Sequence, residues 1–164
     1  MRRLILGFDI GNTGAGALID ETGALLEVID MPTLRDGPKN RPAVNAALLA
    51  ETVWKWRATE AFVEYVGARP GEGAVGAFAF GRSRGVVEGV LGACGVPATQ
   101  ITPASWKRAV GIPPGRDGAK DAARSEAIRR WPGQAALFAR VKDDGRAEAA
   151  LIAVAGMMRK GGAK

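Results

Sequence analysis

Three acidic residues stand alone inside apolar runs, and this placement constrains what the chain can fold into. Asp9 lies within LILGFDI, Glu64 within AFVEYV and Glu148 within AEAALIA. A buried carboxylate is unfavourable unless a partner compensates its charge, and none of the three runs contains a basic residue. The fold is therefore expected to gather these acids around a shared positive group, and a pair of hard divalent cations would serve.

The amino-acid composition limits the possible catalytic groups and indicates the kind of binding partner. A net charge of +6 favours a polyanionic partner, nucleic acid before membrane, although charge that serves only solubility is the alternative. The chain has no histidine and one cysteine, Cys94, which excludes histidine-based catalysis, cysteine zinc sites and internal disulfides. A basic chain with an acidic, metal-binding centre indicates a nuclease. Its 164 residues are expected to form one domain, residues 1–164.

The terminal segment and the apolar runs indicate a cytoplasmic protein. The N-terminus leads from Met1-Arg2-Arg3 into a short apolar run with no small-residue cleavage site, so no signal peptide is expected. No stretch reaches the roughly 18 apolar residues that a membrane span requires. We therefore expect no membrane partner.

Strand, turn and helix patterns predict an α/β fold. Three antiparallel N-terminal strands are expected at residues 3–10, 15–19 and 24–29, and the proline-rich residues 31–42 are expected to form a loop. Later strands are expected at 61–66 and 98–101, and helices at 44–57, 75–94, from Thr102-Pro103, at 119–130 and from Asp143-Asp144 to about Arg159. This order predicts a mixed five-stranded sheet flanked by helices.

The motif Asp9-Ile10-Gly11-Asn12-Thr13 ends the first expected strand. Gly11 permits a sharp turn and lets a metal or phosphate approach the backbone. The pattern Asp-x-Gly-x-Thr occurs in ribonuclease H-like nucleases and also in sugar kinases and actin-like ATPases. An aspartate that only caps a turn is a further alternative. The kinase and ATPase folds need two such domains with nucleotide between them, and a chain of this length supplies one.

The expected neighbours of Glu64, Asp144 and Glu148 make these acids stronger candidates for metal ligands. A parallel strand beside the first would place Glu64 next to Asp9, although an exposed edge position would give the same pattern. Asp144 and Glu148 are four apart and share one helix face, where two like charges repel unless a cation is shared. Asp143 is the rival to Asp144 as a ligand. The alternative for this segment is a capping aspartate followed by an exposed glutamate.

Basic and aromatic residues supply candidates for DNA contact. Lys107 and Lys120 flank the loop of residues 111–118, whose amides together with lysine ammonium groups suit a phosphodiester track. Exposed positions on solvated helix faces are the alternative. Phe78 and Phe80 are candidates to probe an unstacked base, whereas most tryptophans are expected in the core. The candidate DNA-binding residues are Arg82, Arg84, Lys107, Arg116 and Lys120.

Together these motifs resemble the RuvC-type Holliday junction resolvases of the ribonuclease H-like superfamily, with variation similar to phage or diverged members. The matching segments are ILGFDIG at 5–11, FVE at 62–64, GRSRGV at 81–86, TPASWKRAVG at 102–111 with GAK at 118–120, and AEAALIA at 147–153. The resemblance implies a crossover junction endodeoxyribonuclease. This hydrolase would act as a homodimer on four-way DNA junctions in recombination, repair or phage DNA processing.

The resemblance also implies roles for individual residues. Two Mg²⁺ ions, for which Mn²⁺ can substitute, would be held by Asp9, Glu64, Asp144 and Glu148, and Lys107 or Lys120 would hold the scissile phosphate. The family commonly has its last two acids three apart, but Gly145 stands three before Glu148 here. Asp144 or Asp143 must therefore supply the fourth ligand. The alternatives to this function are an actin-like kinase or ATPase and a non-catalytic module that binds branched DNA.

Overall fold

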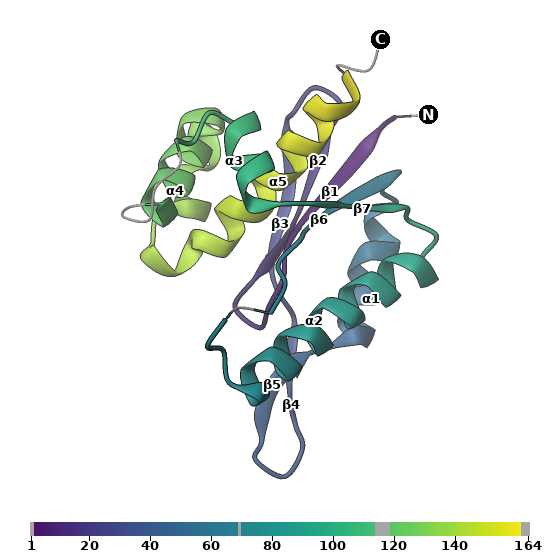
Figure 1. Cartoon of the computed structure of the whole chain (residues 1–164). Helices are drawn as coiled ribbons and strands as arrows, with labels where there is room; N and C mark the ends of the chain where they lie inside the picture. The colour runs from purple at the N-terminus through teal and green to yellow at the C-terminus, as the bar shows by residue number, and fades with distance from the viewer. Residues whose placement is uncertain (1, 69, 114–118, 162–164) are drawn as a thin grey trace.

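The computed structural model describes residues 2–68, 70–113 and 119–161, which form a mixed sheet between two layers of helices (Figure 1). The strand order is β3-β2-β1-β6-β7. The antiparallel strands are β1 (Leu4–Asp9), β2 (Ala15–Asp20) and β3 (Leu25–Asp30), and β6 (Glu60–Glu64) and β7 (Ala98–Ile101) continue the sheet in parallel. The predicted mixed five-stranded, ribonuclease H-like sheet is confirmed.

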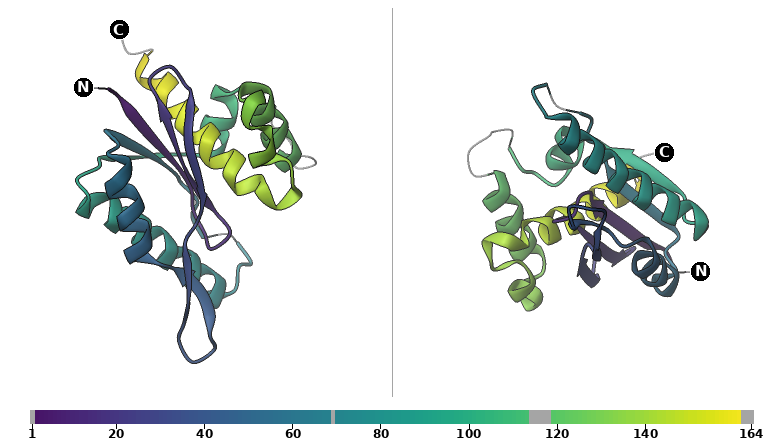
Figure 2. Two further views of the ribbon diagram at one scale, coloured as in Figure 1. Left: turned by 180° about the vertical axis from the view of Figure 1, so that it is seen from behind. Right: turned by 90° about the horizontal axis from the view of Figure 1, so that it is seen from below.

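Helices cover both faces of this sheet (Figure 2). On one face lie α1 (Ala46–Trp56) and α2 (Ala74–Ala93), and on the other lie α3 (Pro103–Ala109), α4 (Ala119–Arg130) and α5 (Asp144–Gly161). Two short 3₁₀ segments, η1 (Pro132–Phe138) and η2 (Val141–Asp143), connect α4 to α5. Within the described residues, no helix is both long and apolar enough to cross a membrane.

The two faces of β1 belong to two hydrophobic cores. Leu6 and Phe8 pack with the α1 and α2 side chains, whereas Ile5 packs with α3, α4 and α5. Successive side chains of a strand point to opposite faces, so a strand covered on both sides reads as a continuous apolar run. Asp9 follows Ile5 and Gly7 in this alternation and therefore points to the α5 face.

Small residues let α5 lie directly on the sheet. A Cβ at Gly7 in β1 would overlap the carbonyl oxygen of Ala149, and a Cβ at Gly156 in α5 would overlap the Phe62 ring. Glycine at these two positions permits an approach that any side chain would prevent. The first turn of α5 is thereby brought to the carboxyl end of β1.

The predicted loop at residues 31–42 is wrong, because most of it forms a β-hairpin. Strands β4 (Thr33–Asp36) and β5 (Arg41–Val44) pair as a separate two-stranded sheet, which projects beyond the main one (Figures 1 and 2). Two of the prolines that suggested a loop are compatible with this ribbon. Pro38 lies in the tip, and Pro42 lies in a ribbon strand, where an outer edge needs no backbone N–H.

Candidate active site

The carboxyl ends of two neighbouring strands bring Asp9 and Glu64 together. β1 and β6 run in parallel with Phe8 opposite Val63, so the next residues along the two strands are Asp9 and Glu64. Glu64 shares the α5 face of the sheet with Phe62, by the same alternation that directs Asp9 to it. Glu64 is buried, which excludes the exposed edge position considered above.

The first turns of α5 add Asp144 and Glu148 to the same cavity. Both are partly exposed and lie one helical turn apart, on one face of α5. The cavity measures about 1200 Å³, and we call it the acid cavity. Lys107 and Phe80 also line it. The lining of the acid cavity therefore includes four acids from three distant segments together with Lys107.

Gly145 accounts for the unusual spacing of the last acids. A Cβ at this position would lie 2.9 Å from the carbonyl oxygen of Thr13 and 3.1 Å from Oδ2 of Asp9. Contacts this short leave no room for a carboxylate side chain at position 145. The glycine thus brings the α5 backbone against Asp9, and the neighbouring Asp144 lines the cavity instead.

A tryptophan that the sequence analysis assigned to core packing contacts the site directly. Trp106 is fully buried, and its Nε1 donates a hydrogen bond of 2.8 Å to Oε1 of Glu64. The ammonium group of Lys107 lies 5.3 Å from the centroid of the Trp106 ring, a cation–π distance. The sequence did offer one signal for this role. Trp106 is adjacent to the candidate Lys107, and both lie in α3, which follows β7, the strand next to β6.

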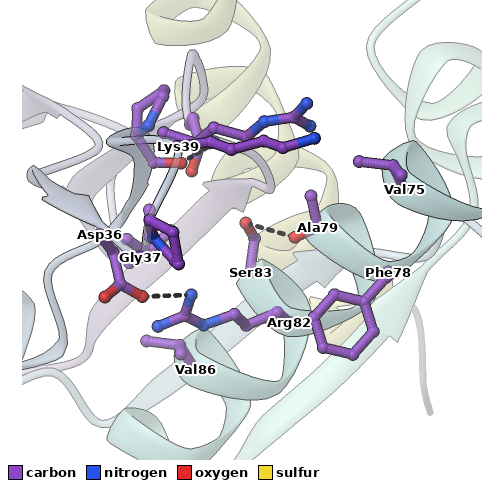
Figure 3. A pocket seen from close by; sticks show the side chains of 15 residues that line it. Asp36, Gly37, Lys39, Val75, Phe78, Ala79, Arg82, Ser83 and Val86 are labelled. Carbon is purple, nitrogen blue, oxygen red and sulfur yellow. Dashed lines mark hydrogen bonds and ion pairs between the residues drawn. The ribbon is translucent and has the colours of Figure 1, made fainter.

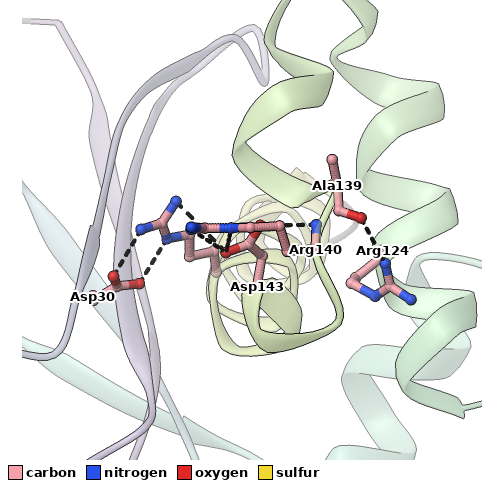
Figure 4. Close-up of polar contacts among 6 residues, drawn as sticks. Asp30, Arg124, Ala139, Arg140 and Asp143 are labelled. Carbon is pink, nitrogen blue, oxygen red and sulfur yellow. Dashed lines mark hydrogen bonds and ion pairs between the residues drawn. The ribbon is translucent and has the colours of Figure 1, made fainter.

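Asp143 and Asp144 both line the acid cavity, and Asp143 is held by Arg140 (Figure 4). Asp143 is buried and accepts hydrogen bonds from the backbone N–H of Arg140 at 2.9 Å and from its Nη2 at 2.8 Å. The Arg140 guanidinium holds the pKa of Asp143 below its ordinary value. Arg146 lies 3.8 Å away and also binds Asp30 at 2.6 and 2.7 Å. Asp143 therefore stabilises the start of α5 through its contacts with Arg140.

The other basic residues predicted to bind DNA are not found in the acid cavity among the described side chains. Arg82 forms an ion pair with Asp36 at 2.5 Å, and Arg84 pairs with Glu88 at 2.9 Å, and neither lines the acid cavity. The predicted contacts of Arg116 and of the Lys120 side chain lie outside the described residues. The sequence analysis missed Arg140 and Lys142, which line the acid cavity. Their position immediately before Asp143 and Asp144 could have indicated that they lie near the acids.

The chemistry of these side chains fits a hard divalent cation, because carboxylate oxygens are the ligands that Mg²⁺ prefers. Among the described residues, no three Cys, Asp or Glu side chains lie close enough together to hold one ion. Mg²⁺ keeps several of its waters and is usually bound through one or two carboxylates, which the acid cavity supplies.

The chain resembles known proteins in its structure but not detectably in its sequence. No protein-family model and no curated protein sequence matches the chain. The mixed five-stranded sheet and its flanking helices are those of the ribonuclease H-like fold class.

Within this class the fold is that of RuvC. The structure titled "T. thermophilus RuvC in complex with Holliday junction substrate" matches with a TM-score of 0.63 and 19% identity, over 98% of this chain and 96% of that chain. A second Thermus thermophilus RuvC structure matches with a TM-score of 0.64 and 20% identity, over 97% and 96%. At such identity the likeness establishes the fold, and it confirms at that level the resemblance that the motifs predicted.

Proposed function

We propose that this protein is a metal-dependent, structure-selective DNA endonuclease that resolves four-way junctions, with residues 1–164 as one nuclease domain. The observation that carries the proposal is the acid cavity, where four carboxylates from three distant segments meet Lys107 on a RuvC-like fold. The cellular context would be recombination, repair or phage DNA processing. A T. thermophilus RuvC structure holds a Holliday junction substrate, which supports the same class of substrate here.

Each residue of the acid cavity has a role in this proposal. Asp9, Glu64, Asp144 and Glu148 would hold two Mg²⁺ ions. When bound, the ions would supply an activated water and stabilise the charge on the leaving 3′-oxygen. The Lys107 ammonium group would hold the scissile phosphate and stabilise its developing negative charge. Because the chain contains no histidine, proton transfer would rely on carboxylates and water.

The long helix α2 supports the proposed homodimer. Its N-terminal half exposes Val75 (61%) and Phe78 (75%) to solvent, and large exposed apolar side chains in one place are typical of an interface. A two-fold dimer would present two acid cavities to a junction with the same symmetry and cut two of its strands. Analytical ultracentrifugation tests this part, because a purely monomeric protein at micromolar concentration would contradict it.

The central test is a cleavage assay with labelled four-way junction, flap and linear duplex, with and without Mg²⁺. We expect Mg²⁺-dependent cleavage of the junction in preference to linear duplex. Asp9→Asn should abolish cleavage but leave junction binding and the melting temperature close to those of the wild type. Glu51→Gln is the matched control, because Glu51 pairs with Lys55 on the exposed surface of α1.

The outcomes of this assay separate the candidate functions. A fully active Asp9→Asn protein would refute the assignment of the acid cavity. Junction binding without cleavage at any Mg²⁺ or Mn²⁺ concentration would instead favour a non-catalytic module that binds branched DNA.

A further inference from the structure

A second cavity lies between the β4–β5 hairpin and the N-terminal half of α2 (Figure 3). It measures about 420 Å³, and we call it the hairpin cavity. Lys39 and Arg41 line it from the hairpin, and Arg82 lines it from α2. Asp36 is the one acidic side chain among the described residues that line it. The hairpin cavity therefore carries an excess of positive charge.

The positive charges at the hairpin are not compensated within the described part of the chain. Asp36 pairs with Arg82 at 2.5 Å, and the Arg82 guanidinium lowers the pKa of Asp36. Within residues 2–68, 70–113 and 119–161, neither Lys39 nor Arg41 takes part in an ion pair. Both side chains belong to exposed residues. Two cationic groups are thus available to an external anion.

The hairpin is fixed in place by polar contacts at both of its strands. The Asp36–Arg82 ion pair ties β4 to α2, and Nδ2 of Asn12 donates a 2.8 Å hydrogen bond to the carbonyl oxygen of Pro42 in β5. The backbone N–H of Asn45 donates to the carbonyl oxygen of Pro32 at 2.8 Å, which closes the base of the hairpin. A hairpin held in this way loses little backbone conformational entropy when it binds a ligand.

The hairpin cavity adjoins the acid cavity. Asn12 lines both cavities, and Thr33, the first residue of β4, lines the acid cavity. The hairpin therefore starts at the rim of the site where cleavage is proposed, and Lys39 and Arg41 lie toward its far end. A four-residue strand extends about 13 Å, at about 3.3 Å for each residue. This length corresponds to about four base pairs of duplex DNA, at about 3.4 Å for each step along one strand.

We propose that the β4–β5 hairpin is a DNA-binding arm whose Lys39 and Arg41 contact backbone phosphates about four base pairs from the scissile phosphate. The inference rests on the proposed function, because it places the bound DNA by its contact with the acid cavity. A second copy of the chain is the competing occupant. The proposed homodimer would use the apolar side chains Val75 and Phe78 of α2, which also line this cavity, whereas a two-fold contact centred on Lys39 and Arg41 would bring their like charges together, which is repulsive.

The test compares two doubly substituted proteins that lose the same charge. In Lys39→Ala/Arg41→Ala the two hairpin cations that line the cavity are removed. The control, Lys55→Ala/Arg159→Ala, removes two cations at the opposite end of the molecule, since Lys55 lies at the end of α1 shortly before β6 and Arg159 lies in the last turn of α5. Binding of a fluorescently labelled four-way junction is measured by anisotropy in EDTA over a series of salt concentrations. Melting temperatures establish that both proteins fold.

We expect the hairpin variant to bind about tenfold more weakly than the control at low salt. Its plot of log K against log salt should have a slope smaller by about 2, because two phosphate contacts are lost. Neutral methylphosphonate linkages, scanned along one arm, should weaken the control at a few positions and leave the hairpin variant unaffected there. If the alanine variant does not fold, Lys39→Gln/Arg41→Gln replaces it.

Equal affinities and equal salt slopes in the two variants would overturn the proposal. So would a change of sedimentation coefficient in the hairpin variant at unchanged DNA affinity, since a second copy would then be the occupant. These readouts use binding without metal. A failure of cleavage in the wild type would therefore count against the proposed function and leave the comparison of the hairpin variants readable.

Discussion

At the scale of single residues, the hydrogen bond from Trp106 to Glu64 is the contact most specific to the acid cavity. A buried carboxylate is sensitive to the loss of a donor, because the acceptor is then left without compensation for its desolvation. The indole N–H thereby orients one oxygen of Glu64. The bond also joins α3 to the end of β6, so one contact links the position of Lys107 to that of the acid.

Trp106→Phe should separate this positioning role from packing, because phenylalanine retains an aromatic ring but lacks the N–H. We expect a protein that folds and binds junction DNA, with the rate of cleavage lowered by about tenfold and a higher Mg²⁺ concentration needed for half-maximal rate. The exposed Trp54, replaced by Phe, is the control. An unchanged Mg²⁺ dependence in Trp106→Phe would show that the indole N–H serves packing alone.

Asp20 gives a prediction for stability at acidic pH. Its carboxylate accepts hydrogen bonds from the Thr22 hydroxyl at 2.6 Å, from the Thr22 and Ala24 backbone N–H groups and from Arg2, and these lower its pKa from 3.8 to about 2. A lowered pKa adds stability that is present above pH 3.8 and is lost as the pH falls toward 2.

Asp20→Asn should therefore be less stable than the wild type at pH 7, by about 1–3 kcal/mol. The difference should shrink as the pH falls from 4 to 2, because the wild-type carboxylate is protonated over this range. Chemical denaturation at a series of pH values measures both quantities. A difference that is constant down to pH 2 would contradict the role assigned to the ionised form.

Single residues also show what sequence reasoning could and could not reach. The acids at positions 9, 64 and 148 were recognisable because a carboxylate in an apolar run is unusual wherever it occurs. Asp143 and Asp144 were not separable, because only the fold reveals which of them faces Arg140. The role of Trp106 depends on a partner 42 positions away in sequence, and no local pattern records that distance.

At the scale of elements, α5 is the helix whose packing determines the site. Its close approach depends on small residues at the contact, so an added methyl group should have a large effect there. We expect Gly156→Ala to destabilise the protein by about 1–3 kcal/mol, because its Cβ would overlap the Phe62 ring. The measurement is urea denaturation followed by circular dichroism.

Gly89→Ala provides the matched control in the other long helix. Position 89 in α2 has no neighbouring atom within 4 Å of an added Cβ, so alanine should gain helix propensity and stabilise by about 0.5–1 kcal/mol. Equal effects at the two positions would show that helix propensity, and not the contact with the sheet, governs α5.

The elements were predictable to different degrees for physical reasons. The five sheet strands and the long helices follow from apolar periodicity, and the Thr102 cap and Pro103 mark the start of α3 correctly. The hairpin was missed because a two-stranded ribbon tolerates proline and carries few apolar residues, so its sequence resembles that of a loop. Its stability comes from Asn12 and Arg82, which lie outside the segment.

At the scale of the whole molecule, a group of acids sits within a chain of net charge +6. A cation that binds only the native state should stabilise it by mass action. We expect the melting temperature of the wild type and of Glu51→Gln to rise with Mg²⁺ or Mn²⁺ concentration, and Asp9→Asn to lose most of this rise. An equal rise in all three proteins would place the bound ion elsewhere.

The arrangement of the acid cavity was the least predictable property at this scale. Sequence patterns indicate which residues are unusual, but the distance between β1 and α5 is set by packing at Gly7 and Gly156. The hairpin cavity likewise depends on how β4 and β5 rest on α2. Neither contact leaves a periodic signal, because each joins segments that are far apart in sequence.

The position of α5 in the chain has a consequence for the timing of activity. Asp144 and Glu148 follow all seven described strands in the order of synthesis, so an emerging polypeptide has only Asp9 and Glu64 of the four acids in place until α5 docks. Under the proposed function, a partly folded intermediate would therefore lack two of the four proposed metal ligands. The proposed activity would then be acquired at the step in which α5 packs on the sheet and completes the core.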